Sequence, residues 1–392
     1  MYLVDSLISL FTLQWTQSEP KLRPLPPHIK RTFVSTPGGD IELLICEPAH
    51  AADTATQKQP PVFFAHGGYG SAGVWLDWMT YLRNRNYSGT LYAYSVRNHG
   101  ASYSLPYWRM VFQTPFEDPQ SDMMACLDYV AQQQKQSSAT SARPPILVGH
   151  SSGGGLSQVL LSGASLNPAL RTKASGLCLV DAIPSYGSYD IYWNWLKQDP
   201  WFPLRSMLHL QHPTSPLSTD RLVHGAFFGH RFPLSATADF RQWMPAYETM
   251  GWPIGMVGNN FWQWARGGQN TWLSCRDIVP NISRAEEMRD GKDKVCVIVG
   301  TEDMMYRPVM WERQAKEYRE ALAQLSREEK GETAPATSAE KEADKPIPEV
   351  TVSSSGGVRV VLVEAAGHHV MNEVDELKYG AAEAFLRWAN QV

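Results

Sequence analysis

Short apolar runs along the chain alternate with segments whose apolar residues recur at helical spacing. This alternation is typical of an α/β protein with a mainly parallel central sheet and helices on both faces. Before it, residues 31–46 hold two strand-like runs around a Pro-Gly-Gly-Asp turn, which predicts a hairpin. The strands predicted in the alternating region are Pro61–Ala65, Thr90–Tyr94, Ile146–Val148, Gly176–Val180, Val295–Val299 and Val358–Val363.

Residues 184–280 break the alternation. They hold eight of the fourteen tryptophans and show no strand–helix rhythm, which predicts a mostly helical cap inserted into the core. Most of these rings should fill the cap itself, and those on its inner surface should face a ligand pocket. The predicted organisation is an N-terminal helix and lead-in over 1–30, the cap over 184–280, and a core in two parts, 31–183 and 281–392.

The second part of the core contains a predicted disordered insertion near residues 327–356. Arg327 to Lys345 has ten charged residues among nineteen and no bulky apolar side chain. Such a composition cannot bury enough apolar surface to fold, so we expect no catalytic residue there.

The first fifteen residues carry apolar side chains at helical spacing, and no basic residue precedes Lys21. The missing positive charge argues against a secretory signal, and it favours a helix docked on the domain. Peripheral membrane contact through residues 1–15 stays open as the alternative. No apolar run approaches the ~20 residues that cross a bilayer, so we expect no integral span. The spaced residues are Val4, Leu7, Ile8, Phe11 and Trp15.

Composition narrows the classes of function. The chain has 392 residues, 43% hydrophobic and 19% charged, which is typical of a globular protein. A net charge of −4 gives no basic patch, so we expect no nucleic-acid partner. Five widely spaced cysteines indicate reduced thiols and a cytoplasmic location, with neither a disulfide framework nor a C-x-x-C metal site. Oligomeric state leaves no signature in this sequence.

A candidate nucleophile stands at the end of a predicted strand. Gly149-His-Ser-Ser-Gly153 follows Ile146–Val148 and leads into a helix, which is the context of a G-x-S-x-G nucleophile elbow. The glycines are needed because bulky side chains would collide across the sharp turn. The motif therefore predicts Ser151 as the nucleophile.

A serine nucleophile needs a base, and the base needs an orienting acid. His368 follows Gly367 after the last predicted strand, and we prefer it to the adjacent His369 as the base. Asp303 follows the strand Val295–Val299 at the edge where parallel sheets gather their ligands, and we prefer it as the acid. Asp181, which follows another strand, is the alternative acid.

An oxyanion hole needs two backbone N–H donors near the nucleophile. We expect one from Ser152, the residue after the nucleophile. The other should come from the loop after Pro61–Ala65, at Gly68, with Tyr69 as the alternative.

Five ordered motifs give the chain a resemblance to the α/β-hydrolase superfamily. The motif Arg97–Ser102 departs from the usual pattern, which begins with an Asp and carries Gly where Asn98 stands. The resemblance implies an α/β-hydrolase fold with an inserted helical cap, and a serine hydrolase that acts on an acyl derivative. The cap matches no particular branch and leaves the substrate open. The motifs are His66-Gly67-Gly68, Arg97–Ser102, Gly149–Gly153, Gly300–Asp303 and Gly367-His368.

The expected partner is a small apolar or aromatic ester, lactone or thioester accepted beneath the cap. Acyl transfer, cyclisation or carbon–carbon bond hydrolysis on a specialised metabolite is the second interpretation, and a non-catalytic ligand-binding protein is the third. We expect no cofactor and no metal, because the glycine-rich loops lack a phosphate-binding pattern and the cap histidines match no zinc spacing. Those histidines are His209, His212, His224 and His230.

Overall fold

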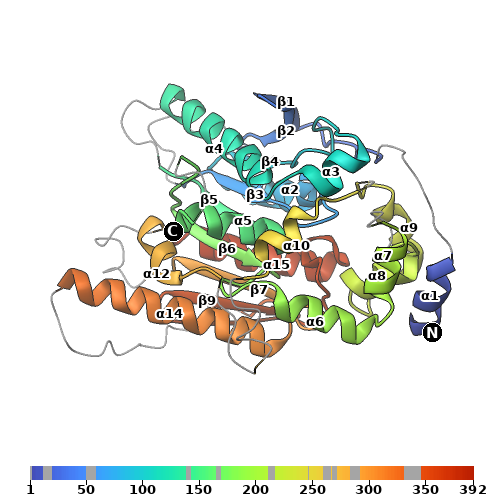
Figure 1. The fold of residues 1–392 in the computed structure, drawn as a ribbon. Coiled ribbons are helices and arrows are strands. Elements are labelled where there is room, and N and C mark those ends of the chain that lie inside the picture. The colour runs from blue at the N-terminus through green and yellow to red at the C-terminus, as the bar shows by residue number, and fades with distance from the viewer. Residues whose placement is uncertain are drawn as a thin grey trace.

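A nine-stranded sheet forms the centre of the protein (Figure 1), in the order β1-β2-β4-β3-β5-β6-β7-β9-β8. Strands β2 and β8 run antiparallel to their neighbours, and β4, β3, β5, β6, β7 and β9 are mutually parallel. The computed structural model describes residues 2–11, 20–49, 59–137, 143–164, 169–210, 217–245, 247–258, 266, 272–282, 292–330 and 346–392.

All strands except β8 lie where the sequence pattern predicts them, and the predicted hairpin is β1 with β2. Because the parallel strands are covered on both faces, they consist almost entirely of buried apolar residues. Their bounds are β1 Ile29–Thr36, β2 Gly39–Cys46, β3 Val62–Ala65, β4 Leu91–Tyr94, β5 Ile146–His150, β6 Gly176–Val180, β7 Val295–Gly300, β8 Val350–Ser355 and β9 Val358–Val363.

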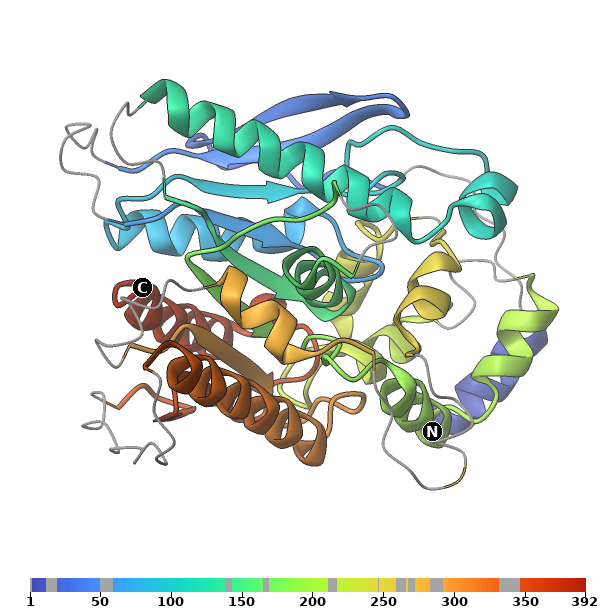
Figure 2. The same ribbon diagram turned by 60° about the vertical axis from the view of Figure 1, so that its left-hand side comes forward.

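Helices cover the sheet on both faces and create two apolar clusters. Apolar residues of α4, α5 and α14 pack on one face, and those of α2 and α15 pack on the other. In Figure 2 the first group lies in front of the sheet and the second behind it. The bounds are η2 Ala72–Trp75, α2 Leu76–Asn84, α3 Tyr107–Gln113, α4 Glu117–Ser137, α5 Ser151–Ser162, η3 Val279–Asn281, α14 Pro308–Lys330, η4 Val370–Asn372 and α15 Asp375–Ala389.

The segment between β6 and β7 consists of helices joined by loops, with no strand in the part that the structure describes. Its helices α6 to α9 lie beyond the carboxyl ends of the parallel strands (Figure 1), whereas α12 packs against α5 and α14. Several of its large side chains, including Trp195 and Trp252, are buried. Its helices are α6 Tyr189–Gln198, α7 Phe202–Leu208, α8 Asp220–Phe227, α9 Leu234–Arg241, α10 Gly251–Met256 and α12 Cys275–Ile278.

The predicted insertion near 327–356 is ordered at both ends, which corrects the sequence expectation there. Helix α14 continues through Lys330, and Val350–Ser355 forms the edge strand β8 beside β9. The charged end of α14 is stable because a long helix with one apolar face needs no apolar residue in its last turn. Residues 331–345 lie outside the described part of the chain.

The N-terminal helix docks by the opposite face from the one its apolar spacing suggests. Helix α1 (Tyr2–Ile8) and the turn η1 (Ser9–Phe11) lie beside α7 and α8. Ser6 is buried and bonds to Asp199 and Arg205, because paired polar groups can replace apolar packing. The apolar residues Val4, Leu7, Ile8 and Phe11 are exposed instead, and Trp15 lies outside the described residues. In the described ranges, no helix has both the length and the apolar character of a membrane span.

Candidate active site

Ser151 occupies a strained turn between β5 and α5. Its φ is +49°, a left-handed conformation that costs free energy in a residue with a side chain. The flanking glycines permit the turn by close backbone approach. A Cβ on Gly149 would lie 2.4 Å from Gly154 Cα, and one on Gly153 would lie 2.3 Å from the His66 carbonyl oxygen. The structure thus places Ser151 at the carboxyl edge of the sheet, as the elbow motif predicts.

His368 and Asp303 form a buried pair beside this turn. Asp303 follows β7, and its Oδ2 lies 2.7 Å from His368 Nδ1. Asp303 Oδ1 accepts hydrogen bonds from the backbone amides of Met305 at 2.7 Å and Tyr306 at 3.1 Å. With Nδ1 directed at a carboxylate, the neutral imidazole holds its proton on Nδ1 and leaves Nε2 as the acceptor nitrogen.

The neighbouring His369 does not pair with Asp303. Its ring is buried between Phe227 and His150, with centroid distances of 4.5 Å to each, and neither ring nitrogen has a hydrogen-bond partner in the described residues. Burial lowers the pKa of His369 well below its usual range, so it stays neutral. His150 Nε2 lies 3.0 Å from the His368 carbonyl oxygen and supports the backbone of that loop.

Asp181 lies on the same edge but bonds elsewhere. It follows β6, has a φ of +40°, and accepts the Gly300 amide at 3.1 Å. Complete burial, and then the charge of Asp303, raise the pKa of Asp181 well above its usual range. We therefore expect Asp181 to be protonated and, through its hydrogen bond with Gly300, to hold the end of β7 that precedes Asp303.

Ser151 and His368 line one cavity of about 380 Å³ beneath the cap helices. Gly68 and Ser152, the expected oxyanion donors, line it beside them. Ser152 Oγ is buried with no hydrogen-bond partner in the described residues. The remaining wall is mainly aromatic and apolar, as in most small-molecule sites, and includes Ile183, Tyr192, Trp195, Phe202, Phe227 and Trp252.

Glu248 is a cavity residue that sequence reasoning missed. Its Oε1 accepts the backbone amide of Tyr69 and lies 2.8 Å from His99 Nε2, and its Oε2 accepts the Trp252 indole N–H at 2.7 Å. The Tyr69 amide therefore already has a carboxylate partner, which favours Gly68 over Tyr69 as the oxyanion donor. A single glutamate in an aromatic cap carries no motif that could have identified it.

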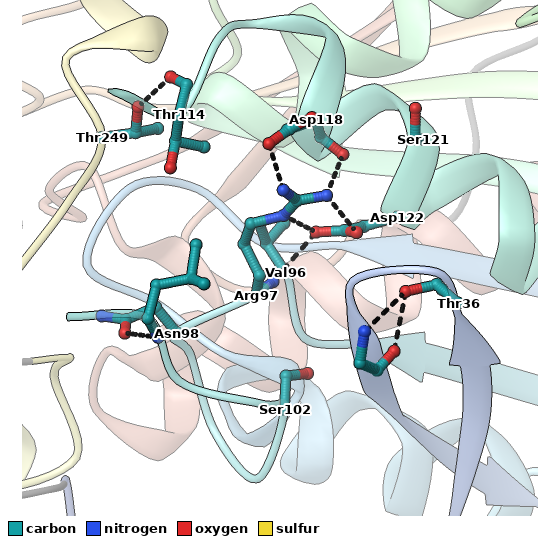
Figure 3. Close-up of polar contacts among 12 residues, drawn as sticks. Thr36, Val96, Arg97, Asn98, Ser102, Thr114, Asp118, Ser121, Asp122 and Thr249 are labelled. Atoms are coloured by element: carbon teal, nitrogen blue, oxygen red, sulfur yellow. Dashed lines mark hydrogen bonds and ion pairs between the residues drawn. The ribbon is translucent and has the colours of Figure 1, made fainter. Parts of the chain in front are cut away.

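Arg97 and Asn98 attach the loop after β4 to its surroundings (Figure 3). The Arg97 guanidinium forms ion pairs with Asp118 and Asp122 of α4. Asn98 has a φ of +66°, which explains why glycine suits the position, and its side-chain amide donates to the Tyr247 carbonyl oxygen of the cap at 3.2 Å. Asparagine therefore accepts the glycine conformation and adds a bond between core and cap.

The cap histidines have partners within the protein. His209 and His224 bond to the carbonyl oxygens of Leu10 and Phe232, and His230 pairs with Glu302 at 2.6 Å. His212 lies outside the described residues. No group of three or more potential metal ligands occurs in the part of the chain that the structure describes.

Comparisons with known proteins agree with this fold. A search of curated proteins finds no match. An esterase from Thermogutta terrifontis (malate bound) has a TM-score of 0.52 at 15% identity, covering 92% of this chain and 98% of its own. A monoglyceride lipase from Saccharomyces cerevisiae has a TM-score of 0.51 at 13% identity, and the match covers 96% of this chain and 98% of the lipase. A loop variant of a haloalkane dehalogenase from Bradyrhizobium elkanii has a TM-score of 0.51 at 13% identity, and the match covers 93% of this chain and 97% of the dehalogenase.

At such identities these structures establish the fold alone, and they confirm the predicted α/β-hydrolase architecture. The sequence profile of the alpha/beta hydrolase family matches residues 62–377, from the first parallel strand to the last helix. Since that match covers most of its length, the chain belongs to the alpha/beta hydrolase family.

Proposed function

We propose that the protein is a serine hydrolase that cleaves a carboxylic ester, thioester or lactone through an acyl-enzyme. The observation that carries this proposal is the 2.7 Å bond from His368 Nδ1 to Asp303, with His368 and Ser151 lining one cavity. A buried acid, an oriented imidazole and a serine on a strained turn are the parts that acyl transfer needs.

In the proposed mechanism, His368 Nε2 takes the hydroxyl proton as Ser151 Oγ attacks the substrate carbonyl carbon. The backbone amides of Gly68 and Ser152 stabilise the negative oxygen of the tetrahedral intermediate. His368 then gives its proton to the leaving alcohol or thiol, and the acyl-enzyme forms. His368 Nε2 next takes a proton from water, whose oxygen attacks the acyl carbon. The bond from that carbon to Ser151 Oγ breaks, His368 returns the proton to Ser151 Oγ, and the carboxylic acid leaves. Asp303 orients the imidazole throughout.

The cavity supports an apolar or aromatic substrate of modest size. Its volume of about 380 Å³ is near the lower end of small-molecule sites. Trp195, Phe202 and Phe227 contribute apolar surface to the wall. We therefore expect short and medium acyl chains or aromatic esters to be turned over faster than long-chain lipids.

We also propose contact with a neutral lipid surface through residues 1–15. Helix α1 is fixed by its polar face and exposes Ile8, and Phe11 is 83% exposed. Helix α7 adjoins it and exposes Met207 on one face, while Phe202 on the other lines the cavity. In sedimentation with phosphatidylcholine vesicles, wild type should pellet with the vesicles and the double variant Ile8→Asp/Phe11→Asp should stay in the supernatant. Equal behaviour of the two proteins would contradict the contact.

The buried free thiols support the expected cytoplasmic location.

A fluorophosphonate probe tests the central proposal. Wild type should be labelled at a single serine, whereas Ser151→Ala should not react and should lose hydrolysis of p-nitrophenyl butyrate. Ser157→Ala is the matched control, because the hydroxyl of this buried serine donates to the Gly153 carbonyl oxygen within α5, and among the described residues Ser157 does not line the cavity. Absence of labelling in folded wild type would favour a non-catalytic binding protein. Labelling without release of acid in water, but with release to an added alcohol, would favour the acyl-transfer alternative.

A further inference from the structure

Three segments of the protein meet at the side chain of Glu248. The residue belongs to the cap, just before α10, yet its carboxylate receives the amide of Tyr69 from the loop after β3. It also contacts His99 of the loop after β4 and the indole of Trp252 in α10. The exposed fraction of its side chain is only 11%, so these contacts are shielded from water.

The hydrogen-bond partners of His99 define where its protons are. Nδ1 lies 2.8 Å from the Arg97 carbonyl oxygen, which can only accept, so Nδ1 carries a proton. Nε2 lies 2.8 Å from Glu248 Oε1, so a second proton must lie between the imidazole and the carboxylate. Complete burial opposes the charge on His99, but the carboxylate of Glu248 outweighs this and raises the pKa of His99 overall. The geometry and this direction both favour an imidazolium–carboxylate pair.

A carboxylate is the only protein side chain that can satisfy this arrangement. Three N–H donors converge on Glu248, from Tyr69, His99 and Trp252. A glutamine has one acceptor oxygen, and its NH₂ group would face either the indole N–H or the other two donors. The three donors thus specify both the charge and the orientation of residue 248.

The pair borders the proposed oxyanion hole. A Cβ built on Gly68 would lie 3.7 Å from Glu248 Oε1 and 3.9 Å from Ser152 Oγ. An uncompensated carboxylate here would oppose the negative charge that develops on the substrate oxygen. His99 cancels that charge while leaving the hydrogen bond to the Tyr69 amide in place.

The surrounding contacts hold both partners of the pair in position (Figure 3). Arg97, two residues before His99, is paired with Asp122 of α4, with its Nε 2.8 Å from Asp122 Oδ2. Thr249, the residue after Glu248, donates its hydroxyl to the Thr114 carbonyl oxygen at 2.8 Å. The carboxylate therefore connects two elements that are each fixed independently.

We propose that Glu248 is a positioning residue that fixes the oxyanion-hole loop against the cap, with His99 as its counter-ion. This inference rests on the proposed serine-hydrolase function. Glu248 acts through the Gly68–Tyr69 peptide, which its carboxylate connects to the cap.

Steady-state kinetics of Glu248→Gln and Glu248→Ala on a p-nitrophenyl ester tests the proposal. Both variants should lose about 10²-fold in kcat with KM within about three-fold of wild type, because the oxyanion hole acts mainly in the transition state. Binding of a trifluoromethyl ketone, which forms a tetrahedral adduct, should weaken in parallel. Tyr247→Phe is the matched control: it removes the neighbouring bond from the phenol to the Leu105 carbonyl oxygen without altering the cavity wall, and should behave as wild type.

A Glu248→Gln variant with wild-type kcat overturns the proposal, as does a raised KM with unchanged kcat. If Glu248→Gln does not fold, His99→Gln tests the same pair, because it can donate to the carboxylate but brings no positive charge. It should also lose kcat, and a kcat within two-fold of wild type overturns the proposal. Fluorophosphonate labelling of wild type distinguishes failure of this inference from failure of the proposed serine-hydrolase function. A labelled wild type with a fully active Glu248→Gln variant refutes the role of Glu248 alone. An unlabelled wild type refutes the proposed function and, with it, the role of Glu248.

Discussion

Replacing Asp303 by asparagine should inactivate the protein by inverting the tautomer of His368. Asp303 Oδ1 receives two backbone amides, from Met305 and Tyr306, so the single carbonyl oxygen of an asparagine must take that place. Its NH₂ group must then face His368 Nδ1 at the 2.7 Å contact. A donor at that position makes Nδ1 the acceptor and leaves the proton on Nε2, where it cannot receive the proton of Ser151.

The expected loss is about 10⁴-fold in kcat, or about 5 kcal/mol of activation free energy. Asp181→Asn offers a matched control on the neighbouring strand end. Because the pKa of Asp181 is raised by burial and by Asp303, its carboxyl is already expected to be neutral, and an amide has nearly the same shape. The amide oxygen can still accept the Gly300 N–H, so kcat should stay within about ten-fold of wild type.

The assay is single-turnover acylation of Ser151 by a p-nitrophenyl ester, with thermal unfolding to confirm that both variants are folded. Single-turnover measurement separates the proton transfer from later steps. If Asp181→Asn loses about 10⁴-fold and Asp303→Asn does not, the assignment of the acid is wrong. If neither loses activity, the tautomer reasoning itself fails.

Three further predictions concern stability. Arg97→Met should lower the free energy of unfolding in urea by about 3 kcal/mol, since it leaves the buried Asp122 carboxylate unpaired, and a change below about 1 kcal/mol would contradict this. Burial and the neighbouring His99 lower the pKa of His66 to about 3, so below pH 6.5 the unfolded chain binds a proton at this residue and the folded protein does not. Stability should fall between pH 7 and 5, by about 2 kcal/mol through His66 and further through His150 and His369, whose pKa values burial also lowers. An unchanged Tm over that range would contradict neutral buried histidines. Trp388→Ala, which empties a fully buried position under the sheet, should cost about 3–5 kcal/mol in the same urea assay, unless the helix relaxes to fill the space.

Much of the core could be predicted because its strands are determined by short stretches of neighbouring residues. The strands Gly176–Val180 and Val358–Val363 are found at their predicted bounds, since a short apolar run covered on both faces has few other stable conformations. The contact between Asp303 and His368 was also predictable, because the carboxyl ends of parallel strands meet at one edge.

The remaining features depend on distant partners that periodicity does not encode. The apolar spacing of α1 predicts an inward apolar face, yet the buried Ser6 finds its partners Asp199 and Arg205 far along the chain. Strand β8 has a mostly polar sequence, and it forms by pairing with the free edge of β9. Glu248 gains its contacts only through the placement of the cap over the core.

The left-handed backbone conformation of Ser151 lowers the thermal stability of the folded protein. That conformation costs about 1–3 kcal/mol in a residue with a side chain, whereas glycine adopts it freely at a cost of up to about 1 kcal/mol in chain flexibility. A Ser151→Gly protein should therefore melt no lower than the native one, and usually higher. It would also keep the cavity open and leave an ester uncleaved, which makes it a suitable form in which to capture an intact substrate for crystallography.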